Sequence, residues 1–163
     1  QSLDELSQFL KRPLDERSLQ QTTLACYRHG KTLDAASLIA ALAEYDKVTR
    51  QVGEFLAQYD ALVTPTCPTT PEPVGTFYPD RPGRDIDTVF ADLAPKETFS
   101  ALFNGTGSPA MSLPLGWTPS GLPIGVQFIA PFGREDTLLR LGAVLETEYD
   151  WSKRRPPVHV ANA

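Results

Sequence analysis

The first part of the chain has apolar positions at helical spacing. In residues 1–10 the leucines lie three or four positions apart, until Pro13 interrupts the pattern. The next segment, 14–29, is mostly polar, and Gly30 is a natural place for a helix to stop. The chain is therefore expected to begin with helices.

A longer apolar series follows and predicts one amphipathic helix of more than six turns. It begins at Thr32 or Asp34, either of which could cap it, and it continues at mostly three- or four-residue steps. The apolar positions are Leu38, Leu42, Tyr45, Val52, Leu56 and Tyr59. Because this stripe has no polar group beyond the tyrosine hydroxyls, we expect the helix to face the core and not to line a cofactor groove.

A short apolar run and a proline-rich stretch come next. Residues 61–63 are apolar and Pro65 ends the run, which predicts a short buried strand. From Thr66 to about Ala94, frequent prolines and little hydrophobic periodicity predict a loop of nearly thirty residues. Loops longer than about 12–15 residues are usually functional or disordered. Two interpretations stay open, a loop that covers a cleft and a surface excursion.

A short helix and a glycine turn are expected after this loop. Residues 96–103 can form two helical turns behind Pro95, with apolar side chains pointing inward. Asn104, Gly105 and Gly107 then predict a turn, because glycine adopts positive φ angles without steric cost.

Two strands and a second long helix complete the pattern. Ala110–Leu115 and Leu122–Ala130 are predicted strands, and a type I turn at 118–121 makes them a hairpin or two neighbouring strands. The helix that follows opens at Glu135 or Asp136, where acidic side chains suit the helix dipole. Its expected core positions are Leu138, Leu141, Leu145 and Tyr149.

These elements predict one partial domain, 1–163, in three consecutive segments. The segments are a helical front, 1–59, a middle with strands and the proline-rich loop, 60–131, and a C-terminal helix with a basic tail, 132–163. Twelve of the 15 prolines fall in the middle segment, which sets it apart from the other two. The basic tail is expected to be solvated.

The composition is typical of a globular protein and argues against several partners. Hydrophobic residues are 41% and charged residues 21% of the 163, which is enough for a core. The net charge of -5 leaves no broad basic face, so neither nucleic acid nor an anionic membrane is an expected partner. No apolar run is long enough to cross a bilayer and no signal peptide is recognisable, so we expect a cytoplasmic location.

Common motifs for metals, phosphates and nucleophiles are not recognisable. Cys26 and Cys67, with two histidines, form neither a disulfide framework nor a metal-ligand spacing, so no metal or cofactor is expected. The glycine turn lacks the Lys-Ser/Thr that follows a phosphate loop. Ser108 and Ser112 lie in no GxSxG or SxxK motif, so structural serines are the better interpretation.

Four motifs in order resemble the C-terminal part of the amidase signature family. They are DALVTPT after a long helix, NGTGSPAMSLPLG, GLPIGVQFIAP and REDTLLRLGAVLE, and the resemblance covers about residues 32–157. The ending WSKRRPP is similar to a bacterial subgroup that includes linear and cyclic amide hydrolases. The resemblance implies an α/β fold with a mixed central sheet flanked by helices, and hydrolysis of amides without a metal or organic cofactor.

The resemblance also implies where the chemistry would lie. Members of the family use a serine nucleophile, a bridging serine in a cis peptide and a lysine base, while backbone N–H groups hold the oxyanion. The Gly/Ser-rich segment with both serines is absent here, and none of the five lysines lies in the family's catalytic strand context. No catalytic residue is therefore expected in this chain, and the whole set would lie upstream of Gln1.

Two parts of the chain correspond to family segments that contact substrate. By position they contain the five substrate-pocket candidates Thr66, Cys67, Glu97, Thr98 and Ala101. Glu97 lies near the place where some relatives recognise a substrate amino group, and the alternative is a first-turn glutamate stabilised by the helix dipole. Cys67 has a polarisable side chain, and the alternative is a partly buried small hydrophobe. Asn104 is expected to hold the turn.

Two functions stay open at this point. The first is a C-terminal piece of an amidase that supplies strands and part of a pocket for a small-molecule amide, with the upstream catalytic half of the same chain as its partner and association with a second copy left open. The alternative is a stand-alone binding or scaffold module without catalysis. The first predicts uncovered sheet edges and apolar helix faces, and the second predicts a self-sufficient core.

Overall fold

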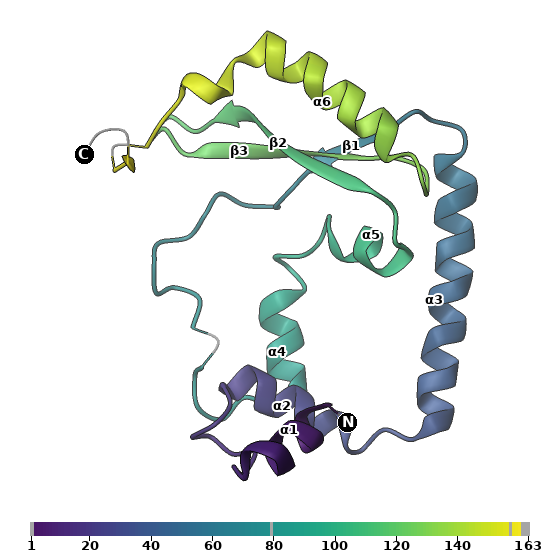
Figure 1. Cartoon of the computed structure of the whole chain (residues 1–163), viewed down its shortest axis with the longest axis vertical. Coiled ribbons are helices and arrows are strands. Elements are labelled where there is room, and N and C mark those ends of the chain that lie inside the picture. Colours follow the sequence, from purple (N-terminus) through teal and green to yellow (C-terminus); the bar gives the residue numbers. More distant parts are fainter. Residues whose placement is uncertain (1, 79, 157, 161–163) are drawn as a thin grey trace. The chain divides into compact units, whose positions relative to one another are not determined.

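A computed structural model describes residues 2–78, 80–156 and 158–160 (Figure 1). Pro79 of the proline-rich stretch and Pro157 of the WSKRRPP ending lie outside these ranges. In chain order the elements are α1 (Ser2–Leu10), α2 (Gln21–Gly30), α3 (Ala35–Leu56), β1 (Leu62–Pro65), α4 (Ile86–Leu93), α5 (Ala101–Thr106), β2 (Ala110–Trp117), β3 (Pro123–Ile129), α6 (Glu135–Tyr149) and the 3-10 turn η1 (Trp151–Lys153).

The chain forms two compact units, each of which combines two separate stretches of sequence. The first unit consists of residues up to 42 and residues 71–96, and the second of residues 43–70 and those from 97 onward. The expectation of a single partial domain in three consecutive segments stays a prediction.

The first unit is built from α1, α2, α4 and the loop that precedes α4. The Lys31 ammonium lies 2.6 Å from the Asp4 carboxylate, which ties α2 to α1, and the Tyr27 hydroxyl donates to the same carboxylate. These contacts lower the pKa of Asp4, with the Lys31 hydrogen bond as the main cause. Leu24 of α2 and Val89 of α4 are fully buried and form the apolar interior of this unit.

The proline-rich loop is shorter than expected, because α4 lies within it. The prediction of irregular structure up to Ala94 is wrong for Ile86–Leu93. Asp85 caps this helix by accepting a 2.8 Å hydrogen bond from the Thr88 amide, and hydrogen bonds from Thr88 lower the pKa of Asp85. The Arg84 side chain is buried and lies 2.9 Å from the Asp92 carboxylate, which anchors the loop to α4.

The long helix α3 confirms the helix prediction but not the prediction that it faces the core. Of the two candidate caps, Asp34 is the one in place, since its carboxylate accepts a 2.8 Å hydrogen bond from the Ser37 amide. Leu56 at its end is buried, whereas Leu38 and Tyr45 remain 59% and 56% exposed. The apolar spacing was sufficient to form the helix, but the described residues give most of this stripe no packing partner.

The second unit contains a sheet with the strand order β1–β3–β2, in which both pairs are antiparallel. The predicted hairpin is confirmed, with β2 and β3 joined by a turn in which the Gly121 amide donates to the Thr118 carbonyl at 2.9 Å. The predicted buried strand at 61–63 is observed as β1, but its burial alternates and Val63 is 55% exposed. It lies at an edge of the described sheet, a position that tolerates Pro65.

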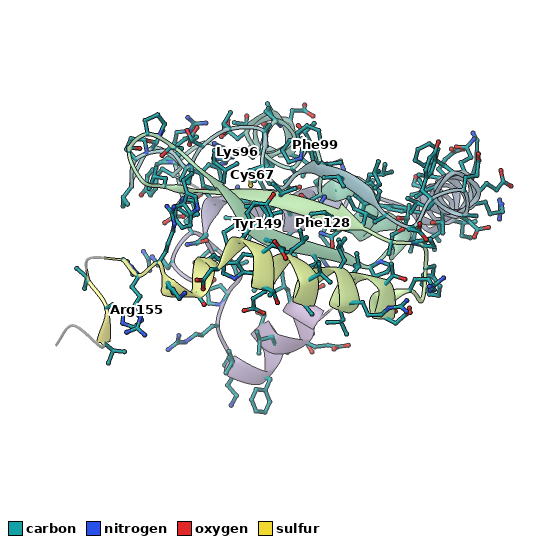
Figure 2. The ribbon with its side chains drawn as sticks, turned by 90° about the horizontal axis from the view of Figure 1, so that it is seen from above. Cys67, Lys96, Phe99, Phe128, Tyr149 and Arg155 are labelled. Carbon is teal, nitrogen blue, oxygen red and sulfur yellow. The ribbon has the colours of Figure 1, made fainter. Side chains whose placement is uncertain are left out.

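Helix α6 covers one face of this sheet (Figures 1 and 2). Phe128 and Ala130 of the β3 region and Leu138 of α6 are buried there, with Leu141 and Leu145 packed around them. The opposite face has its own apolar cluster, formed by Leu56, Phe103 and Ile129. The expected inward position of Tyr149 is wrong, since its side chain is 57% exposed.

The C-terminal tail contacts the end of β2. The Arg154 guanidinium lies 4.4 Å from the centre of the Trp117 ring at the end of β2.

Among the described residues, no helix has the length and apolar character that crossing a membrane requires. The helices and the sheet together give the α/β class that the sequence predicts.

Candidate functional site

The sheet face opposite α6 changes from apolar to polar along the strands. Alternate residues of a strand point to the same face, so the register defines which side chains share it. At one end Leu62, Ile129 and Ala110 lie side by side across the three strands. Two residues further along, their places are taken by Thr64, Gln127 and Ser112. We call this second region, together with Thr66 and Gly125, the polar face.

Gln127 is the most buried side chain of the polar face. It is 6% exposed, and its Nε2 donates to the Thr64 hydroxyl at 3.2 Å and to the Phe99 carbonyl at 2.8 Å. One side chain in β3 therefore binds both β1 and the segment that precedes α5.

A pair of hydroxyl groups lies at the end of β1. The oxygens of Thr66 and Ser112 are 2.6 Å apart, and the Thr66 amide donates to the Gly125 carbonyl at 3.0 Å. A Cβ atom on Gly125 would lie 2.7 Å from the Thr66 hydroxyl and 3.0 Å from that of Ser112. Gly125 is thus the residue that leaves room for the two hydroxyls to meet over β3.

Cys67, the next candidate, lies just beyond β1 as an exposed free thiol. The partly buried, hydrophobic alternative is therefore wrong for this chain. The labelled side chains of Cys67 and Phe99 locate in Figure 2 the two segments that the sequence identified as substrate-contacting.

The segment with the other candidates has a different structure from the one expected. The predicted helix at 96–103 is wrong in its bounds, because a turn precedes α5 and the helix begins only at Ala101. The Glu97 carbonyl accepts from the amides of Ser100 and Ala101. Glu97, Thr98 and Ala101 are exposed. Glu97 is therefore not a first-turn residue of α5, and the helix-dipole alternative does not apply in that form.

The glycine turn also begins later than predicted. Asn104 and Gly105 lie inside α5, and only Gly107 adopts a positive φ, 69°, where it ends the helix. A Cβ on Gly105 would lie 2.8 Å from the Tyr45 ring of α3. Glycine is therefore needed at this position because α5 and α3 approach closely there, and not because the chain turns. The sequence pattern identified the glycines correctly as special positions but assigned Gly105 the wrong reason.

The structure links the two predicted segments through a residue that the sequence analysis did not select. Thr66 and Cys67 follow Thr64, while Thr98 and Ala101 flank Phe99, and Gln127 holds both Thr64 and Phe99. Ser112 was interpreted as structural, and its hydroxyl now lies against Thr66. The available signal was a single polar residue, Gln127, inside the apolar strand VQFIA.

Two hollows of about 340 and 220 Å³ are lined by none of the predicted site residues. Within the described ranges, no three His, Cys, Asp or Glu side chains converge in a way that could hold a metal ion.

The comparisons with known proteins agree with the order of the motifs. The amidase family model matches residues 1–139, and the chain belongs to the amidase family. The recognition of that family from its motifs is thereby confirmed.

Among individual relatives, the chain is similar to the 6-aminohexanoate-cyclic-dimer hydrolase of Pseudomonas sp. (strain NK87). The two are 31% identical over 154 residues, which cover 91% of this chain and 31% of that protein. AmiC of Mycobacterium leprae (strain TN) is 34% identical over 139 residues, which cover 85% of this chain and 29% of AmiC. The chain thus spans about three tenths of the length of these relatives.

A solved structure shows the same arrangement of elements. The structure of a 6-aminohexanoate cyclic dimer hydrolase matches with a TM-score of 0.81 at 30% identity, and the match covers 94% of this chain and 33% of that one. The fold is therefore that of a C-terminal portion of the amidase signature architecture, as the motifs implied.

Proposed function

We propose that this chain is the part of an amide hydrolase that supplies the β1–β3–β2 strands, their flanking helices and one wall of the substrate pocket. The observation that supports this most is the polar face, on which Gln127 connects the Thr66–Cys67 segment to residues 97–101. Membership of the amidase family makes an amide the expected substrate. In this proposal the two compact units belong to one partial domain of that enzyme.

The groups on this wall suit the recognition of an amide. An amide presents N–H donors and a carbonyl acceptor, and hydroxyl groups such as those of Thr66 and Ser112 can supply the partner for either. The exposed Cys67 thiol adds a small polarisable contact beside them. Exposed Glu97 would favour substrates that present an amino group, since a carboxylate stabilises a nearby ammonium.

The chemical step requires groups that this chain does not contain. We infer that the serine nucleophile, the bridging serine and the lysine base come from an upstream catalytic half of the same protein. The exposed stripe of α3 supports such a partner, because a soluble protein rarely leaves a large apolar patch uncovered. The exposed stripe does not favour the alternative of a stand-alone scaffold module, because such a module would bury its apolar residues in a core of its own.

Turnover of a simple aryl amide tests the proposal. The intact protein is expected to hydrolyse it, whereas the purified 163-residue chain is expected to show no turnover. Mixing the chain with a separately produced catalytic half should restore activity, which distinguishes a missing catalytic set from mere unfolding. Hydrolysis by the pure chain alone would refute the assignment of chemistry to another part of the protein.

Cytoplasmic location and self-association are further parts of the proposal. Cell fractionation of the intact protein tests the first, and size-exclusion chromatography tests the second. The chain alone is expected to self-associate more strongly than the intact protein, since burial of the α3 stripe would remove the apolar surface.

A further inference from the structure

Gln127 uses both hydrogens of one amide group to join two segments that are distant in sequence. Its Nε2 donates to Thr64, its cross-strand neighbour in the register of β1 and β3, and to the backbone carbonyl of Phe99. A carboxamide nitrogen has two donors, so these two bonds use its full capacity. No further donor remains on this nitrogen for a substrate.

The Phe99 carbonyl is available to Gln127 because α5 begins only at Ala101. In the helical ladder of this segment, the Ala101 amide bonds to the Glu97 carbonyl and the Asn104 amide to the Ser100 carbonyl. The Phe99 carbonyl lies just outside that ladder and takes its partner from the sheet at 2.8 Å. If this partly buried carbonyl loses its hydrogen-bond partner, leaving it unpaired costs free energy.

The two ends of α5 are anchored by different means. Phe103 is 7% exposed and packs with Leu56 and Ile129, which holds the helix itself to the sheet. In the segment before the helix, 97–100, Glu97 and Thr98 are exposed and the other two residues are partly buried, and the Gln127 bond ties its backbone to β3. Loss of that bond is therefore expected to loosen the backbone around Phe99, while Phe103 keeps α5 in place.

We propose that Gln127 is a positioning residue that sets the separation of the Thr66–Cys67 segment from residues 97–101, and hence the width of the pocket for the amide substrate. This inference rests on the proposed function above, because only that function makes both segments parts of the substrate pocket. Gln127 acts through Thr64 and Phe99 and does not itself contact substrate.

The variants that test this remove the donors at constant size. Gln127→Met in the intact protein keeps the side-chain volume and removes both bonds, while Thr64→Val removes only the bond to β1. Gln58→Met is the matched control, since Gln58 is exposed and its Nε2 donates to the nearby Glu54 carbonyl at 3.4 Å.

Two measurements decide the role of Gln127. Hydrogen exchange should accelerate about 10-fold in residues 97–101 of Gln127→Met, the effect of losing one hydrogen bond to a partly buried carbonyl, and should stay unchanged in 138–145 of α6. KM for the aryl amide should rise about 5- to 10-fold while kcat stays within about 2-fold, because positioning affects binding of the substrate. Thr64→Val should show a smaller change of the same kind, and Gln58→Met none.

The contradicting results are equally specific. Unchanged exchange in 97–101, or an equal acceleration on both faces of the sheet, would show that Gln127 only contributes to general stability. Local acceleration with an unchanged KM would show that the separation of the two segments does not control the pocket. Since exchange needs no turnover, an inactive wild-type protein would refute the proposed function and still leave the positioning of 97–101 to be decided by exchange.

Discussion

The two faces of the β1–β3–β2 sheet are formed by the same strands but differ in what covers them. The α6 face is apolar and is closed by α6 over β2 and β3, with Phe128 and Leu138 buried between sheet and helix, although Val63 of β1 stays exposed. On the other face, Ile129 is buried at one end and the polar face begins only two residues away, at Gln127. The closed face stabilises the unit, while the polar face presents the hydroxyl groups of Thr66 and Ser112, which the proposed function assigns to the substrate pocket.

The largest effect is expected on the closed face. Leu138→Ala should reduce the free energy of unfolding by about 2–5 kcal/mol, because it leaves a cavity beneath α6. Denaturant unfolding of the intact protein measures this. Leu139→Ala is the control, since the neighbouring side chain is 70% exposed and its loss should cost about 0.5 kcal/mol or less. Equal losses at the two positions would contradict the closed packing of this face.

A methyl group added on the polar face should lower the free energy of unfolding. Gly125→Ala should cost about 1–3 kcal/mol, because its Cβ would lie 2.7 Å from the Thr66 hydroxyl. Gly53→Ala is the matched control, since nothing lies within 4 Å of a Cβ there and a helix interior favours alanine. A Gly125→Ala protein with unchanged unfolding free energy and KM would show that the hydroxyl pair has no defined geometry.

Elements that depend on contacts between neighbouring residues could be predicted from the sequence, whereas features that depend on distant contacts could not. The leucine spacing of α6 and the turn residues of the hairpin are local signals, and both elements were predicted. The helix α4 was missed because nearby prolines obscured an apolar spacing of only two turns, although Asp85 and Thr88 provided a capping signal. The exposure of the α3 stripe could not be predicted, since periodicity does not specify a packing partner.

The candidate site was predicted only in part for a related reason. Motifs identified Thr66, Cys67 and the 97–101 segment by position in the family. The bond from Gln127 to Phe99 joins residues 28 positions apart through a backbone carbonyl, which no pattern of side chains reveals. The sequence favours a structural role for Ser112 over that of a nucleophile. It does not reveal that its hydroxyl lies beside that of Thr66, which is 46 residues away.

A smaller effect is expected from the hydroxyl pair itself. Ser112→Ala removes the partner of Thr66 and should raise KM about 2- to 10-fold, the range of one ordinary hydrogen bond, with little change in unfolding free energy. Ser120→Ala is the control because it breaks a similar Thr–Ser pair in the hairpin turn, 2.9 Å apart, away from the polar face. Equal KM values for Ser112→Ala and Ser120→Ala would show that Ser112 does not contribute to substrate binding.

The smallest and most selective effect concerns Glu97. Glu97→Gln should reduce kcat/KM for amides with a free amino group by about 1.5- to 5-fold relative to neutral amides, since an exposed charge pair contributes modestly. Comparing the two substrate types on the intact protein measures this, with Glu148→Gln on α6 as the control. An equal loss on both types of substrate would exclude recognition of an amino group by Glu97.

The central claim is that the polar face and the thiol beside it form a wall of the substrate pocket. The most direct measurement is the rate at which a small alkylating agent modifies Cys67 and Cys26 in the intact protein, with and without a saturating non-hydrolysed amide, read by peptide mass. Both thiols are exposed in this chain, so Cys26 is an internal control. We expect the amide to slow the modification of Cys67 several-fold and leave that of Cys26 unchanged. An unaltered Cys67 rate, or a Cys67 that never reacts, would contradict the account, because a pocket open to substrate also admits the reagent.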